Sequence, residues 1–436
     1  MTKTQDLKIE QKEAVLNRVL KVLDEKFYQP EKLGVSWNDA VARHRPEVID
    51  APTAAAFEQA VTRLLEELKT SHIGFFHGSA RRASSRAALS ATYLADDTDE
   101  GRRWIFQDVH AGGAASLAGI GPGDILLRVG AEEIIPPIHP TFAMGETTEL
   151  TVLAADGEVR TRSVTVARPK GKKLHFVEPE LVVGNRLQDG IGYLKVAMFP
   201  GMVGVEVANE ISNQVEQLGN VKHLIIDLRG NTGGGIGALR VMSLLTPKKI
   251  PVGFSLDRKS AQRNIADAKS SFRRFDRIPA SKNRLWLLAL RYAPVLLKKS
   301  SIVLETEGLG DKPFHGSVFL LVDRHTASAA EMIVAFAREN SLAAIVGEKT
   351  AGRLLSATSA KVGHGYRLAF PTGAYYTWKG SVLEGTPIEP DECVAFDWRE
   401  ARLGNDPQLN RCIALLDRNL TGSAFKKTNQ AQLLDL

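Results

Sequence analysis

The stretch HLIIDLRGNTGGG at residues 223–235 decides the fold of this chain. Its first six residues are mostly apolar, which predicts a strand buried on both faces of a sheet. Glycines follow, and glycine lets the backbone turn where other residues would be strained. Residues 236–245 then place apolar side chains at helical spacing. The stretch therefore predicts a buried strand, a glycine-rich turn and a helix.

The same pattern continues on both sides of this stretch. Residues 192–196 and 203–218 have the patterns of a strand and a helix. Residues 318–322, 329–339 and 344–346 have those of a strand, a helix and a strand. Such alternation is typical of parallel strands covered by helices. We therefore expect an α/β fold with a mostly parallel, buried sheet in its core.

Two regions of different character precede this core. Residues 5–75 carry apolar side chains at helical spacing, whereas short apolar runs alternate with Gly and Asp turns between about 86 and 169. The expected organisation is a helical region at 1–85, a β domain at 86–170, the α/β core at 171–400 with an insertion at 258–299, and a C-terminal helix and tail at 401–436.

Composition excludes several classes of protein. The chain has 436 residues, of which 24% are charged and 44% hydrophobic, so it is neither collagen-like nor largely disordered. Two cysteines, Cys393 and Cys412, make no disulfide scaffold and no zinc motif. The first residues lack the apolar segment of a signal peptide, which favours the cytoplasm. We expect no metal, no cofactor and no nucleic-acid partner.

The positive charge of the chain is local. Residues 258–299 contain twelve Lys and Arg against two Asp, a net charge of +10, whereas the whole chain carries +6. Apolar residues from Trp286 to Leu297 are interspersed among these cations. Three interpretations of this insertion remain open. The favoured one is a lid over the cleft or a contact in a homo-oligomer. The other two are association with an anionic membrane surface and a solvated excursion.

Two segments at the predicted carboxyl ends of strands can carry chemistry, because catalytic groups gather there in open α/β sheets. The glycine cluster at 233–235 exposes backbone N–H groups that suit an anion or a developing oxyanion, or it is only a tight turn. It lacks the Lys-Ser/Thr pair of a phosphate loop. Ser328 is either a nucleophile or a helix N-cap paired with Glu331 in a capping box.

Four motifs in one order carry a family resemblance. They are a GGAA…AGIGPGDIL stretch within residues 109–130, IDLRGNTGG at 226–234, TASAAE at 326–331 and GEKTAG at 347–352. The first resembles the signature of a PDZ domain. Together they resemble the carboxy-terminal processing and tricorn-core family of serine peptidases over most of the chain. The resemblance implies a PDZ-like domain inserted before a peptidase core whose nucleophile is Ser328.

The resemblance offers two catalytic solutions, and this chain fits one of them. The Ser-Lys branch uses a lysine at the position of Arg353, and a guanidinium releases no proton near neutral pH; Lys349 and Lys361 lie off the motif. The tricorn-like branch uses a Ser-His pair upstream of the PDZ domain and a late Glu. Ser71, His72 and Glu384 match those positions, which implies His72 as general base, with His325 as its closest rival.

The resemblance also implies sites for the oxyanion and for substrate. The oxyanion donors are the backbone N–H groups of Gly233 or Gly234 and of Ala329. A PDZ-like domain binds peptide along a strand edge, and residues 88–93, including Leu89 and Ser90, are the predicted binding strand. Arg353 is a further candidate contact for substrate. The alternative is that the inserted domain is only structural.

The predicted function is hydrolysis of peptide bonds in peptides, unfolded proteins or protein C-terminal tails. Ser328 attacks the scissile carbonyl, and His72 accepts and then returns the proton. Two alternatives remain: a catalytically silent relative that binds a peptide or an apolar ligand, and a PDZ-like scaffold with an inactive core.

Overall fold

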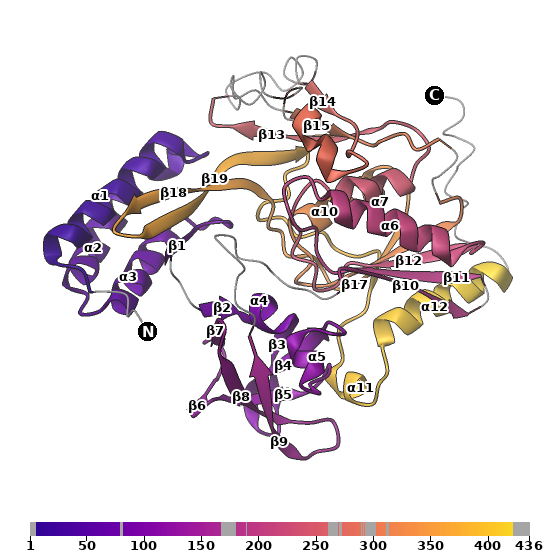
Figure 1. Cartoon of the computed structure of the whole chain (residues 1–436), viewed down its shortest axis with the longest axis horizontal. Helices are drawn as coiled ribbons and strands as arrows, with labels where there is room; N and C mark the ends of the chain where they lie inside the picture. The colour runs from indigo at the N-terminus through magenta and orange to yellow at the C-terminus, as the bar shows by residue number, and fades with distance from the viewer. Residues whose placement is uncertain are drawn as a thin grey trace.

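The computed structural model of this chain describes residues 6–78, 82–166, 180–188, 190–259, 269, 273–288, 290, 292, 302–310 and 314–421. It has the mixed α/β character expected from the sequence, with helices and several sheets (Figure 1). Residues 167–179, around the expected boundary between the β domain and the core, half of the basic insertion and the tail beyond 421 lie outside the described residues.

Three helices open the described chain and cover a long antiparallel hairpin. They are α1 (Ile9–Lys26), α2 (Val35–Asp50) and α3 (Ala54–Glu66). Their apolar faces pack on β18 (Leu355–Gly363) and β19 (Tyr366–Thr377). β1 (Gly74–His77) pairs with β19 directly after the helices. The residues between α3 and β1, which include Ser71 and His72, are therefore held beside this hairpin.

A separate antiparallel sheet follows, with a hydrophobic core of its own. Its strands run in the order β3 (Ala91–Thr98), β4 (Gly101–Val109), β5 (Ile125–Val129), β8 (Thr147–Leu153) and β9 (Val159–Thr165). Shorter elements border it: β2 (Arg82–Ser84), α4 (Ser85–Leu89), α5 (Ala114–Leu117), β6 (Glu132–Glu133) and β7 (Thr141–Ala143). We call residues 82–166 the β domain.

A further large sheet contains β12, the strand that begins the stretch at residues 223–235. Its order is β10 (Val182–Gln188), β11 (Ile191–Val196), β12 (His223–Asp227), β16 (Ser317–Val322), β17 (Ala344–Gly347) and β20 (Glu392–Cys393). β11, β12, β16, β17 and β20 pair in parallel, and β10 is antiparallel to β11.

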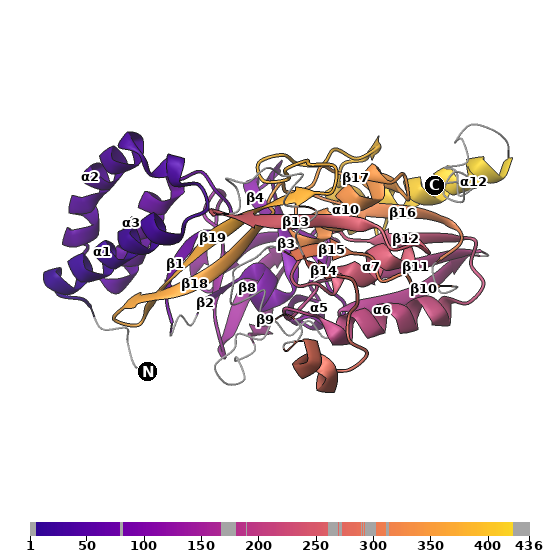
Figure 2. The same ribbon diagram turned by 90° about the horizontal axis from the view of Figure 1, so that it is seen from above.

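Helices cover this sheet on both faces, because its buried strands present apolar side chains to both. Leu224 and Ile226 of β12 pack with α6 (Val205–Leu218), α7 (Ala238–Leu244) and α10 (Ala329–Glu339). Ile225 points the other way, toward α12 (Pro407–Thr421). Figure 2 shows α6 and α12 on opposite sides of the sheet. A short helix, α11 (Trp398–Arg402), precedes α12.

The remaining strands extend the sheet that holds the hairpin. β13 (Pro251–Asp257) pairs with β19, and β15 (Ile302–Glu305) pairs with β13. β14 (Arg273–Phe275) adds to β15, so part of the basic insertion is a strand of this sheet. Trp286 and Leu290, exposed at 61% and 64%, follow in the same insertion. Its role as a lid, a membrane contact or a solvated excursion stays a prediction.

Candidate active site

Ser328 begins helix α10, directly after the turn that leaves β16. Its backbone is left-handed, with φ 54° and ψ −121°, a conformation that a non-glycine residue adopts only when its surroundings enforce it. Two contacts do so here: the Ser328 amide lies 3.1 Å from Oε2 of Glu331 and 3.0 Å from the carbonyl oxygen of Arg353. The half-buried side chain is thereby fixed at the carboxyl end of the sheet.

The glycine loop after β12 packs directly against this turn. A methyl group on Gly233 would lie 2.6 Å from Cβ of Ser328 and 2.7 Å from the amide nitrogen of Ala329, so only glycine fits. The loop is also tied to the turn by the Ala327 amide, which donates to the carbonyl of Asn231 at 2.9 Å. The two predicted chemical segments therefore meet.

The amides of this loop differ in availability. The Gly233 N–H donates to Oδ1 of Asn231 at 2.8 Å, so the prediction of Gly233 as an oxyanion donor is wrong for this conformation. Gly234 is exposed, and neither its amide nor that of Ala329 hydrogen-bonds to another described residue. Of the three predicted oxyanion donors, Gly234 and Ala329 therefore have amides without a partner among the described residues.

Ser71, His72 and Glu384 come together although 313 residues separate the first from the last. The Ser71 hydroxyl donates to Oε2 of Glu384 at 2.7 Å, and its oxygen lies 2.6 Å from Nδ1 of His72. The Ser71 amide donates to Oε1 of Glu384, also at 2.7 Å. These contacts orient the imidazole of His72, whose backbone φ is 57°.

The loop at residues 350–354 joins this group to Ser328. Its Arg353 carbonyl accepts from the Ser328 amide, and the next amide, that of Leu354, donates to Oε2 of Glu384 at 3.2 Å. Two consecutive residues thus connect the nucleophile turn to the carboxylate that holds Ser71. The four residues predicted as catalytic are gathered in one region of the fold.

The surroundings of His72 lower its pKa and so favour the neutral ring. Burial lowers the pKa of His72, the nearby Glu384 carboxylate raises it, and the Arg353 guanidinium lowers it again. The net direction is downward from the ordinary histidine value. A neutral imidazole can accept a proton, so this environment suits a general base.

The rival bases have other partners or positions. Nε2 of His325 lies 3.0 Å from the carbonyl oxygen of Tyr93 in β3, which directs this ring toward the β domain. Lys349 is an exposed residue just past β17, and Lys361 is exposed on β18, within the hairpin that packs on the N-terminal helices.

The predicted peptide-binding strand needs correction. Residues Ser85–Leu89 form helix α4, and β3 begins only at Ala91. Leu89 and Ser90 are 0% and 3% exposed, because Leu89 belongs to the hydrophobic core of the β domain and Ser90 lies against Gly113. Neither residue can contact a substrate directly in this conformation.

Sequence reasoning overlooked what Glu331 does. Its fully buried carboxylate accepts from Thr350 Oγ1 at 2.6 Å, from the Gly352 amide at 2.7 Å, from the Arg353 amide at 2.9 Å and from the Ser328 amide at 3.1 Å. The capping-box spacing was the only signal, and it accounts for one of these four bonds. Glu331 positions the nucleophile and the 350–354 loop together.

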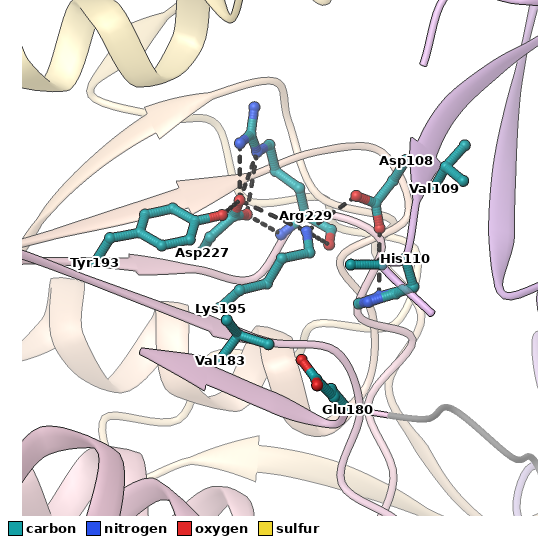
Figure 3. A pocket seen from close by; sticks show the side chains of 10 residues that line it. Asp108, Val109, His110, Glu180, Val183, Tyr193, Lys195, Asp227 and Arg229 are labelled. Carbon is teal, nitrogen blue, oxygen red and sulfur yellow. Dashed lines mark hydrogen bonds and ion pairs between the residues drawn. The ribbon is translucent and has the colours of Figure 1, made fainter. Parts of the chain in front are cut away.

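Sequence reasoning also missed a charged junction between the β domain and the core (Figure 3). Lys195 of β11 donates to Asp108 of β4 at 2.9 Å and lies 3.5 Å from Asp227. Arg229 pairs with Asp227 at 2.7 Å. These groups border a cavity of about 250 Å³ that is separate from Ser328. The spacing of single charges along the chain gave no signal for this junction.

Two kinds of feature are absent from the described part of the chain. No cluster of His, Cys, Asp and Glu there could hold a metal ion. No helix there is both long and apolar enough to cross a membrane.

Comparison with known proteins identifies relatives of this chain. It is 24% identical over 417 residues to tricorn protease homolog 2 of Streptomyces coelicolor, covering 89% of this chain and 31% of that protein. It is also 24% identical over 301 residues to the carboxyl-terminal-processing protease of Synechocystis, covering 65% and 57%. The chain thus covers less than two thirds of either relative.

Solved structures share the fold. The photosystem II D1 C-terminal processing protease superposes with a TM-score of 0.54 at 17% identity, over 91% of this chain and 98% of that one. Mature CPAF complexed with lactacystin gives 0.59 at 14% identity, over 95% and 98%. Residues 190–394, which contain the glycine loop, Ser328 and Glu384, match the model of peptidase family S41. The family-level resemblance found in the sequence is thereby confirmed, and over residues 190–394 the chain is similar to peptidase family S41.

Proposed function

We propose that this chain is a serine peptidase that hydrolyses peptide bonds in peptides or partly unfolded proteins, with Ser328 as nucleophile and His72 as general base. The observation that carries the proposal is the hydrogen-bonded group of Glu384, Ser71 and His72, joined to Ser328 through Arg353 and Leu354. The match of residues 190–394 to peptidase family S41 supports a peptidase, and this group supports the tricorn-like solution over a Ser-Lys pair.

The hydrogen bonds of Ser71 determine which nitrogen of His72 is the base. The Ser71 hydroxyl carries one hydrogen and gives it to Glu384. Its oxygen must then accept the hydrogen on Nδ1 of His72. In a neutral imidazole this leaves the lone pair on Nε2, which is the nitrogen that takes the proton of Ser328 in the proposed reaction.

The reaction follows the general course of acyl transfer. Oγ of Ser328 attacks the scissile carbonyl while His72 takes its proton and then passes it to the leaving amine. The amides of Gly234 and Ala329 stabilise the oxyanion, aided by the N-terminus of α10. Water then attacks the acyl-enzyme while His72 takes its proton. His72 returns this proton to Oγ of Ser328 as the acyl group leaves as a carboxylic acid. No cofactor is needed.

The β domain has a proposed role in substrate binding. Its antiparallel sheet ends at β3, whose strand partner among the described residues is β4; residues 91–94 of β3 are buried, whereas residues 95–98 are partly or fully exposed. Together with the sequence signature at 109–130, the exposed half of this edge strand supports a PDZ-like domain that adds a peptide strand beside residues 95–98. The organisation into a helical region, a β domain, a peptidase core and a C-terminal helix is part of the same proposal.

A fluorophosphonate probe tests the proposal. The purified protein is treated with the probe, and the adduct is located by mass spectrometry. Labelling at Ser328 is expected, with loss in Ser328→Ala and His72→Ala and retention in His44→Gln, a histidine on α2 that serves as a matched control. Absence of labelling together with absence of casein cleavage would favour the alternative of a silent binding protein. Labelling that persists in His72→Ala would contradict the role of His72.

A further inference from the structure

Arg353 lies immediately beside the nucleophile. Its carbonyl accepts from the Ser328 amide at 3.0 Å, and its own amide donates to Oε2 of Glu331 at 2.9 Å. These two bonds hold the backbone of Arg353 next to that of Ser328, while Arg353 itself is exposed. Its position relative to the reacting atoms is therefore set by the same buried carboxylate that positions the nucleophile.

The charge of Arg353 is not neutralised within the described structure. No described carboxylate forms an ion pair with it, whereas Arg324 on the nucleophile turn pairs with Glu348 at 2.7 Å. The two acidic groups of the site are already occupied. Glu331 accepts four donors, and Glu384 accepts from Ser71 and Leu354.

One histidine of the β domain lies within electrostatic range of Arg353. His139, on the loop between β6 and β7, lies against Trp104 with ring centroids 4.4 Å apart and is exposed. Burial lowers the pKa of His139, and the charges of His325 and Arg353 lower it further, so these groups lie in one another's electrostatic range. His139 of the β domain thus belongs to the electrostatic surroundings of Arg353.

We propose that Arg353 is a substrate-binding residue that takes a carboxylate of the peptide, next to the scissile bond. A planar guanidinium binds a carboxylate through two parallel hydrogen bonds, and such charge-assisted pairs are stronger than neutral ones. The carboxylate comes either from the free C-terminus of the substrate or from an acidic side chain. The inference rests on the proposed peptidase function and names the substrate class of that site.

Binding of short peptides tests this subsite without relying on turnover. Three probes share a dansyl label: tetra-alanine with a free carboxylate, the same peptide with an amidated end, and an amidated form with Glu at the second residue. Their Kd values are measured by anisotropy on Ser328→Ala protein. At least one of the two charged peptides should bind about tenfold to a hundredfold more tightly than the neutral one. Which of them does so identifies the source of the carboxylate.

Variants of Arg353 decide whether that residue is responsible. In the Ser328→Ala background, Arg353→Gln should abolish the preference and Arg353→Lys should restore part of it. Lys349→Gln, which removes another exposed cation from the same region, should leave the preference intact. Equal Kd values for charged and neutral peptides, no measurable binding of any probe, or a preference that survives Arg353→Gln would overturn the proposal.

Failure of the subsite is distinguishable from failure of the proposed function. Fluorophosphonate labelling of Ser328 reports the nucleophile and needs no carboxylate, so it should persist in Arg353→Gln. Labelling with no carboxylate preference would reject the subsite alone. A carboxylate preference in Kd without any labelling would reject the peptidase and keep the subsite.

Discussion

The hydroxyl of Ser71 donates to Oε2 of Glu384 at 2.7 Å and so makes its own oxygen an acceptor for Nδ1 of His72. One serine thereby transmits the position and charge of a carboxylate to an imidazole. The same carboxylate holds the Leu354 amide, next to the residue that contacts Ser328. The tautomer of His72 and the position of the nucleophile depend on a shared group.

Ser71→Ala should lower activity without unfolding the protein. The substitution removes the acceptor for Nδ1 of His72, so the imidazole loses both its preferred tautomer and its orientation. General acid–base catalysis contributes about 10²–10⁴-fold to such reactions, and we expect a decrease in kcat within that range. Steady-state kinetics on a peptide substrate measure the decrease in kcat. Denaturant unfolding checks that the protein stays folded. Unchanged kcat would contradict the role of Ser71.

Glu384→Gln should be at least as harmful as Ser71→Ala, for a different reason. A glutamine amide has one accepting oxygen, whereas the carboxylate accepts from Ser71 Oγ, the Ser71 amide and the Leu354 amide. If the new NH₂ group faces the Ser71 hydroxyl, that hydroxyl donates to Nδ1 of His72 instead. The hydrogen then moves to Nε2 and the base is lost.

The measurement for Glu384→Gln combines kinetics with stability. The rate of fluorophosphonate labelling at Ser328 should decrease about 10²-fold or more, while an unsatisfied backbone donor costs about 1–3 kcal/mol of unfolding free energy. Glu389→Gln, an exposed carboxylate on the same segment, is the matched control and should change neither quantity. A fully active Glu384→Gln protein would remove Glu384 from the mechanism.

The pH dependence of labelling follows from the pKa of His72. Burial and the Arg353 charge together place this pKa below the ordinary histidine value of about 6.5, so the base stays neutral in mildly acidic solution. The acid limb of the labelling rate should therefore lie below pH 6.5. Arg353→Gln removes one cause of the lowering and should move the limb to higher pH, whereas Arg353→Lys should not.

How much the sequence predicts depends on whether a feature is local. The strand at 223–227, its glycine turn and helix α10 follow from short apolar patterns, and the structure has α10 at Ala329–Glu339 as predicted. Of the strand predicted at 88–93, residues 91–93 lie in β3, whereas residues 88 and 89 were predicted wrongly, because a five-residue helix leaves little periodicity.

The site was predictable only where motifs carry it. Residues as far apart as Ser71 and Glu384 meet through tertiary contacts that no local spacing encodes, so their pairing rested on the family resemblance. The commitment of the Gly233 amide to Asn231 depends on loop geometry, which residue types do not determine. The four bonds of Glu331 likewise involve residues up to 22 positions away.

Glu331→Gln should weaken both the fold and the nucleophile. Its buried carboxylate accepts four donors, and an amide in its place would turn an NH₂ group toward at least one of them. We expect a loss of about 1–3 kcal/mol in unfolding free energy for each donor left unsatisfied. Labelling of Ser328 should slow as well, because the left-handed backbone of this residue depends on that contact.

A second variant tests whether Glu331 acts on labelling by positioning Ser328 or only by stabilising the fold. Thr350→Val removes one donor and leaves the Ser328 amide contact intact, so it should cost stability with little change in the labelling rate. If Thr350→Val and Glu331→Gln slow labelling equally, Glu331 acts through general stability and not through the position of Ser328.

The junction of the β domain and the core makes stability depend on pH. His110 lies in this junction, where Nη2 of Arg86 approaches its Nε2 at 3.3 Å; this contact needs a lone pair on that nitrogen and thus the neutral ring. Burial lowers the pKa of His110 to about 4, although Asp108 at 3.5 Å opposes the change. An unfolded chain protonates the same ring near pH 6.5.

This difference in pKa determines whether stability rises or falls with pH. Between pH 6.5 and pH 4 the unfolded chain binds a proton at residue 110 that the folded protein does not, so stability is complete above pH 6.5 and declines as pH falls toward 4. His110→Gln should reduce the dependence over this interval, even if it lowers stability at pH 7.5. Urea unfolding at pH 7.5, 5.5 and 4.5 measures this dependence of the unfolding free energy on pH, with His44→Gln as control. An equal decline in wild type and His110→Gln would show that other groups govern it.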